Sequence, residues 1–208
     1  MTPHATLSRR CLLLATGSTI ASVATLALAG CDKVLPASYN GIDITGANYA
    51  QDFRLTDADG HERTLADFKG KAVMMFFGFT QCPDVCPTAL VRAAEIKRML
   101  GADGDRLQVI FVTVDPERDL PVVLKAYTQA FDASFIGLYG DLKRTSETAK
   151  AFKVFYKKVP TGSSYTMDHS AFSYVFDPKG KIRLVLRHEQ SADECAQDLR
   201  QILKTTSA

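Results

Sequence analysis

The chain has 208 residues, of which 46% are hydrophobic and 23% charged, and its formal net charge is +2. This length suits one domain with terminal extensions, and the composition excludes a disordered or collagen-like chain. Arg9 and Arg10 are the only Lys or Arg of the first thirty residues, which contain no acid, so 23 basic (25 less these two) and 23 acidic residues remain. Nucleic-acid binding relies on clustered Lys and Arg, so no nucleic-acid partner is expected.

Residues 1–30 predict a secretory signal peptide, with a basic start, an uncharged apolar stretch and small residues at its end. The ending Leu28-Ala-Gly-Cys31 resembles a bacterial lipoprotein cleavage box, in which the cysteine carries the lipid. We therefore expect lipidation of Cys31 and a place on the periplasmic side of the bacterial inner membrane. An uncleaved membrane anchor is the alternative, and the arginine pair leaves both Sec and Tat export open.

Residues 31–49 are polar and contain Pro36, Gly41 and Gly46. They predict a lipid anchor and tether that ends in an edge strand. The folded domain is then expected to occupy residues 50–208.

Strand and helix patterns alternate along the domain. A hairpin turning at Asp59-Gly60 opens it, and the apolar runs 72–79 and 107–114 predict buried strands. Further elements are expected at 88–100 (helix), 119–131 (helix with Asp119 as N-cap), 135–138 (strand), 141–152 (helix), 171–176 and 182–186 (a strand hairpin), and after Ser191 (helix with a capping box). This order predicts an α/β fold whose central mixed sheet has helices on both faces.

Three cysteines follow Cys31. Cys195 shares a helical face with Leu199 and Ile202, which predicts a small buried side chain. Cys82 and Cys86 lie where an apolar strand turns into a helix, and the free N–H groups and dipole of a helix start favour thiolate. Their spacing allows either a disulfide or one bound metal ion. A purely structural disulfide is disfavoured, because so short a loop constrains the unfolded chain little.

A histidine could complete a metal site with these cysteines. His61 at a hairpin tip and His188 in a charged run predict solvated surface residues. His169 precedes the strand 171–176, which could end beside the cysteine turn in a central sheet, although a structural histidine stays open on spacing alone. Asp168 could orient the His169 ring without itself binding the metal. Asp84 is expected to be solvated or to cap the helix that follows it.

Three motifs in order resemble one family. They are Phe77-Gly-Phe-Thr-Gln-Cys-Pro-Asp-Val-Cys-Pro-Thr88, Val114-Asp-Pro-Glu-Arg-Asp119 and Asp168-His-Ser170. Together they strongly resemble the SCO/SenC family of copper chaperones, over about residues 53–203. The resemblance implies a thioredoxin-like fold, copper bound by Cys82, Cys86 and His169, and a membrane tether. It further implies help in assembling the binuclear copper centre of cytochrome c oxidase.

The copper-centre subunit of that oxidase is therefore an expected partner, with other periplasmic copper carriers as further candidates. Soft thiolates select Cu(I), and imidazole accepts both Cu(I) and Cu(II). Two sulfurs and one nitrogen leave an ion that a partner's thiols can attack. These residues thus predict a metallochaperone rather than an enzyme.

Two other functions use the same residues. Cys82 and Cys86 could form a redox-active pair that reduces the cysteines of a copper-protein partner through a mixed disulfide. The usual thioredoxin motif, however, has two residues between its cysteines and this chain has three. A peroxiredoxin-like peroxidase with Cys86 as nucleophile is the third possibility, but it leaves Cys82 and the Asp168-His169 pair unexplained.

Overall fold

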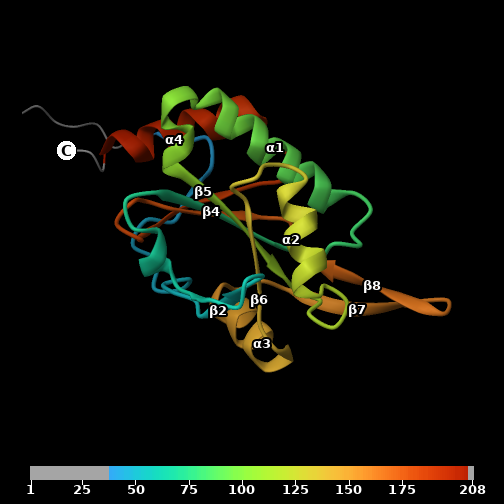
Figure 1. The fold of residues 1–208 in the computed structure, drawn as a ribbon. Helices are drawn as coiled ribbons and strands as arrows, with labels where there is room; N and C mark the ends of the chain where they lie inside the picture. Colours follow the sequence, from blue (N-terminus) through green and yellow to red (C-terminus); the bar gives the residue numbers. More distant parts are fainter. Residues whose placement is uncertain (1–37, 206–208) are drawn as a thin grey trace, which may run out of the picture. The chain divides into compact units, whose positions relative to one another are not determined.

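The centre of the sheet is built from the two apolar runs of the sequence. The computed structural model describes residues 38–205 (Figure 1). β4 (Ala72–Gly78) and β5 (Leu107–Thr113) are buried at every residue and pair in parallel from Ala72 opposite Leu107 to Gly78 opposite Thr113. Strands buried on both faces read as continuous apolar runs, which explains why their sequences show no alternation.

Six further strands extend this pair to both sides. The sheet order is β1-β10-β9-β4-β5-β6-β2-β3. β6 continues the parallel part, whereas β9 pairs antiparallel with β4 and β2 antiparallel with β6. The sheet is therefore mixed, as expected. The added strands are β1 (Ile42–Asp43), β2 (Leu55–Asp57), β3 (Glu62–Arg63), β6 (Ile136–Tyr139), β9 (Ser173–Phe176) and β10 (Ile182–Leu186).

Helices cover the sheet on both sides. α1 and α4 lie together above the sheet in the view of Figure 1, and α3 lies below it. The helices are α1 (Val85–Met99), α2 (Pro121–Gln129), α3 (Leu142–Ala151) and α4 (Ala192–Thr205), with short 3₁₀ helices η1 (Leu65–Phe68) and η2 (Gly101–Arg106). In the described part of the chain, no helix combines the length and apolarity that a membrane crossing needs.

Most expected boundaries are confirmed within a few residues. The Ser191 backbone N–H donates to the Glu194 carboxylate at 2.9 Å, and the Glu194 N–H donates to the Ser191 hydroxyl at 3.2 Å, as a capping box requires. Asp141 caps α3 by accepting the N–H of Arg144 at 2.7 Å.

Two helices begin elsewhere than expected. α1 begins at Val85 rather than residue 88, so that Cys86 lies in its first turn. α2 begins at Pro121 with Leu120 at the N-cap position, and Asp119 does not cap it. The carboxylate of Asp119 instead accepts hydrogen bonds from neighbouring strand ends, which removes it from the helix start.

Residues 153–170, expected as a loop, contain an unexpected hairpin. β7 (Tyr156–Thr161) and β8 (Ser164–His169) pair only with each other among the described strands, and they project away from the main sheet (Figure 1). Five of the six β7 residues are exposed, and β7 contains Pro160. Such a strand lacks the apolar alternation from which a strand is predicted.

The folded part of the chain includes residues that were expected to form the tether. β1 pairs antiparallel with β10, which agrees with the expected edge strand. The fully buried carboxylate of Asp198 in α4 holds this segment, accepting the backbone N–H groups of Asn40 and Gly41 at 2.9 and 2.8 Å. Folded structure therefore begins before the expected boundary at residue 50. Residues 1–37, with the predicted signal peptide and Cys31, lie outside the described residues.

Replacing Asp198 with Ala is expected to lower the free energy of unfolding by about 2 kcal/mol, because donors of Asn40 and Gly41 would lose their acceptor in a partly buried place. Asp193→Ala, on an exposed residue of the same helix, should change it by only about 0.5 kcal/mol. Urea denaturation of both variants measures the difference. Equal losses in the two variants would contradict the assigned role of Asp198.

Candidate metal centre

The two cysteines lie on the turn that joins β4 to α1. Cys82 is partly buried and precedes the helix, while Cys86 is fully buried in the first helical turn. The Cys82 N–H donates to the Phe79 carbonyl at 3.2 Å, which tightens the turn. Asp84 takes the N-cap position and is exposed, but its side chain makes no capping hydrogen bond. The Cys86 sulfur is therefore held inside the protein, and that of Cys82 lies nearer to solvent.

Gly78 makes room for the buried sulfur. A Cβ atom at this position would lie 2.7 Å from Cys86 Sγ and 2.9 Å from the Phe111 ring. Only a residue without a side chain lets the end of β4 approach the sulfur so closely. This requirement was not recognised from the sequence, because a glycine at a strand end is equally typical of an ordinary turn.

His169 is the last residue of β8 and points its ring at the cysteine turn. Its Nε2 lies 3.5 Å from Cys86 Sγ. The rings of Phe76 and Phe79 meet the imidazole edge-on, with centroids 6.0 and 5.8 Å away. Two aromatic rings thus limit the orientations open to the imidazole.

A backbone carbonyl selects the histidine tautomer. His169 Nδ1 lies 3.1 Å from the carbonyl oxygen of Ser170. Because a carbonyl only accepts, Nδ1 carries the proton and Nε2 keeps a free lone pair toward the sulfurs. The sequence suggested the Asp168 carboxylate for this role, but Asp168 is exposed and the contact belongs to Ser170. Backbone acceptors have no sequence signature, so this contact could not be foreseen.

The three side chains form one compact group of potential ligands. The Sγ atoms of Cys82 and Cys86 and a ring nitrogen of His169 all lie within 4.8 Å of one another. His61, exposed at the β2–β3 turn, and His188, after β10, are not members of this group. Two sulfurs with one imidazole form a donor set for a soft or borderline ion, such as Cu(I) or Zn²⁺.

The two thiols have opposite protonation tendencies. The Cys86 thiol donates a hydrogen bond to Cys82, which is the main reason that the pKa of Cys82 falls well below its ordinary value. Partial burial of Cys82 opposes this effect, while the backbone N–H groups of Asp84 and Cys86 add to it. The same hydrogen bond, together with burial, raises the pKa of Cys86 far above the usual range. The two thiols therefore titrate as a coupled pair, in which the thiolate is favoured at Cys82 and the proton at Cys86.

Cys195 has no part in this group. It is fully buried in α4, as expected, and burial raises its pKa to about 11. All three cysteines of the described residues are free thiols. Only Cys82 among them combines exposure with a lowered pKa, so it is the reactive thiol.

The chain is similar to known proteins in both sequence and fold. A family model described as SCO1/SenC matches residues 43–204. An SCO2-like protein of Rickettsia felis is 40% identical over 133 residues, which cover 62% of this chain and 65% of that protein. The match thus spans slightly less than two thirds of the length of this relative.

Solved structures resemble most of the folded part. The structure of Bradyrhizobium japonicum ScoI with copper bound has a TM-score of 0.67 and 41% identity, covering 73% of this chain and 97% of that one. Yeast Sco1 with copper bound has a TM-score of 0.67 and 33% identity, covering 74% and 87%. These similarities confirm the expected thioredoxin-like α/β fold.

Alkylation with iodoacetamide of the reduced chain should modify Cys82 in preference to Cys86 and Cys195. Because its pKa is lowered, the thiolate persists as the pH falls, and the rate at Cys82 should stay nearly constant from pH 8 to pH 6. An ordinary thiol with a pKa of about 8.5 loses roughly tenfold in thiolate per pH unit over this range. Peptide mass spectrometry measures each site, with Cys195 as the internal control. A tenfold fall per unit at Cys82 would contradict the assignment.

Proposed function

Because this chain belongs to the SCO1/SenC family, we propose that it binds one copper ion through Cys82, Cys86 and His169 and passes it to a partner. The convergence of the three ligand atoms carries this proposal: Cys86 and His169 are 83 positions apart, yet all three atoms lie within 4.8 Å. Proteins similar to this chain are named as copper-bound structures, which supports copper among the ions that suit the donor set.

The arrangement suits an ion that is carried rather than kept. Two thiolates favour Cu(I), and the imidazole also allows Cu(II). Three ligands leave room for an incoming thiol from a partner. Cys82 is the more exposed sulfur, so exchange with the partner begins there, while buried Cys86 and His169 still hold the ion.

The acceptor that we propose is the copper-centre subunit of cytochrome c oxidase, with other periplasmic copper carriers as further partners. Membership of the family and the donor set support this assignment. The proposed place is the periplasmic side of a bacterial inner membrane, through a lipid on Cys31. The signal-like residues 1–30 and the Leu28-Ala-Gly-Cys31 sequence support it.

Reduction of a partner's disulfide is the second candidate, and the protonation of the thiols favours it. An accessible thiolate at Cys82 can attack the disulfide and form a mixed disulfide with one partner sulfur, releasing the other. Cys86 then transfers its proton to the released partner thiolate and attacks the Cys82 sulfur, which frees the reduced partner and leaves a Cys82–Cys86 disulfide. The peroxidase alternative has less support, because it requires a reactive thiolate at Cys86. That residue is buried and its pKa is raised.

Cu(I) titrated into the reduced chain should bind with one ion per chain. His169→Ala should weaken binding by at least tenfold, because the remaining dithiolate lacks its third ligand, while a disulfide reductase would hardly be affected. His61→Ala, an exposed histidine at the β2–β3 turn, is the matched control and should bind as the parent does. Competition with a Cu(I) chelator measures the affinities. The copper affinity of the parent should decrease as the pH is lowered, because the ligands must be deprotonated. Parent-like binding by His169→Ala would exclude the three-ligand site.

Cys31→Ser should abolish incorporation of radiolabelled palmitate when the chain is made in bacteria, because the lipid is expected on that thiol. Cys11→Ser is the control and should leave labelling intact. Label that survives Cys31→Ser would exclude the lipoprotein assignment.

A further inference from the structure

A turn of five residues, Asp115 to Asp119, lies between the two segments that supply the metal ligands. It follows β5 at the end of the sheet where β4 leads into the cysteine turn, and the Val114 N–H donates to the Gly78 carbonyl at 2.8 Å. None of its side chains belongs to the ligand group. Three of its charged residues, Asp115, Arg118 and Asp119, are nevertheless largely buried, which requires an explanation.

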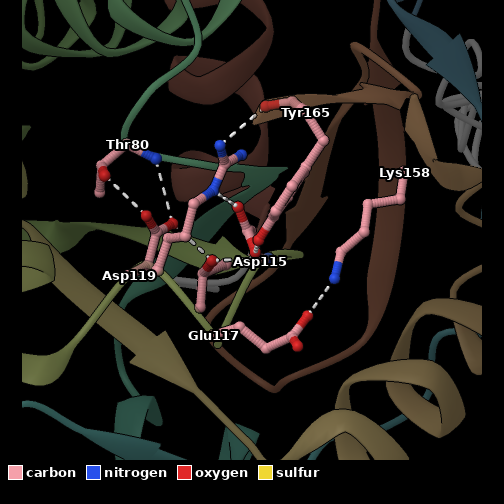
Figure 2. Close-up of polar contacts among 8 residues, drawn as sticks. Thr80, Asp115, Glu117, Asp119, Lys158 and Tyr165 are labelled. Carbon is pink, nitrogen blue, oxygen red and sulfur yellow. Dashed lines mark hydrogen bonds and ion pairs between the residues drawn. The ribbon is translucent and has the colours of Figure 1, made fainter. Parts of the chain in front are cut away.

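Asp119 connects the turn to the cysteine segment. Its carboxylate, 1% exposed, accepts the backbone N–H of Thr80 at 3.0 Å and the Thr80 hydroxyl at 2.6 Å. The hydroxyl of Thr113 donates to the same carboxylate at 2.6 Å. Figure 2 shows the carboxylate directed at Thr80. Since Thr80 is two residues before Cys82, these bonds fix the start of the cysteine turn.

Arg118 connects the same turn to the histidine hairpin. Its guanidinium pairs with Asp115, donates to the Tyr165 carbonyl at 2.8 Å and stacks 3.7 Å from the centre of the Tyr165 ring. The Tyr165 hydroxyl donates a hydrogen bond to the Asp115 carboxylate at 2.9 Å (Figure 2). Tyr165 precedes His169 by four residues on β8. The ion pair is largely buried, with side chains 17% and 1% exposed.

The hairpin depends on such contacts because no sheet partner holds it. In the described residues, β7 and β8 pair only with each other, and Met167 is the one fully buried residue of the two strands. The position of His169 relative to the cysteines is thus set by side chains and the hairpin base rather than by strand register.

A second ion pair joins the same two segments but differs in burial. Lys158 of β7 contacts Glu117 of the turn, and their side chains are 46% and 47% exposed. Pairs this exposed contribute little, because water and salt screen them. Lys158 also lies over the Tyr165 ring, with Nζ 4.4 Å from the ring centre, so replacing Glu117 rather than Lys158 provides the matched control for the buried contacts of Arg118.

We propose that the Asp115–Asp119 turn positions both halves of the metal site, with Asp119 acting through Thr80 on the cysteines and Arg118 acting through Tyr165 on His169. The expected effect of this turn on copper binding rests on the proposed copper function. The positions of the side chains can be tested without a metal. The two connections are separable, since each acts on a different ligand.

Proton NMR of the reduced, metal-free full chain in detergent tests the histidine connection. The parent should show nuclear Overhauser contacts between the His169 ring and the rings of Phe76 and Phe79. Arg118→Lys keeps the charge but cannot make both the Asp115 and Tyr165 contacts, so these signals should be lost or shifted. Glu117→Gln, which breaks only the exposed ion pair with Lys158, should retain them.

Tyr165→Phe is a milder variant in case Arg118→Lys does not fold. It removes only the hydroxyl bond to Asp115, and the same ring contacts should weaken. Parent-like contacts in every folded variant that breaks the connection would overturn the proposal.

Copper affinity then separates the two connections. Arg118→Lys should weaken Cu(I) binding about tenfold, the scale typical when partners behind metal ligands are removed. Arg118→Lys should cause no further loss of Cu(I) affinity when His169 is already Ala, whereas a general structural defect would weaken binding in both backgrounds. Thr80→Val should lower the Cu(I) affinity by a similar factor in the parent and in the His169→Ala background, because Thr80 acts through the cysteines. Thr80→Ser keeps the hydroxyl and should bind Cu(I) as the parent does.

An equal loss from Arg118→Lys in both backgrounds would overturn the role assigned to that residue. A Thr80→Val variant with unchanged affinity would overturn the role of Asp119. A parent chain that bound no copper would instead refute the proposed function, and the ring contacts would still decide whether the turn positions His169.

Discussion

The parallel pairing of β4 with β5 is the constraint on which the site depends. Because the strands run in the same direction and end together at Gly78 and Thr113, the segments that follow them leave from one edge of the sheet. One segment carries Cys82 and Cys86, and the other carries the turn Asp115–Asp119. Open α/β sheets place their sites at this edge for the same topological reason. The complete burial of both strands makes their register costly to change, so the edge is a rigid base.

The antiparallel strand β9 brings the third ligand to the same edge. β9 pairs with β4 from Val73 opposite Phe176 to Phe76 opposite Ser173, so the chain enters β9 beside the end of β4. His169 lies a few residues before that entry. Its ring then fits between Phe76 and Phe79, and the Ser170 carbonyl leaves Nε2 facing the sulfurs.

The site combines a fixed part with a part held by side-chain contacts and the base of a hairpin. Cys86 is enclosed by the helix and by the close approach of Gly78, whereas His169 ends a hairpin outside the main sheet. Such a division suits a carrier, since a ligand on a separate hairpin can be released without disturbing the core.

The sequence by itself determined the sheet, the helices and the cysteine pair, because apolar runs, caps and cysteine spacing are local signals, and its resemblance to the SCO/SenC family added His169 as the third candidate ligand. It left open which contacts orient His169, misplaced the role of Asp119 and missed the hairpin Tyr156–His169, whose exposed strand has no apolar pattern. Only the tertiary structure decided that Asp119 accepts hydrogen bonds from Thr80 rather than capping a helix. It also decided that a backbone carbonyl rather than Asp168 orients the imidazole. These outcomes depend on contacts between residues far apart along the chain, such as Thr80 with Asp119, and on backbone groups that every residue possesses, so no local pattern encodes them.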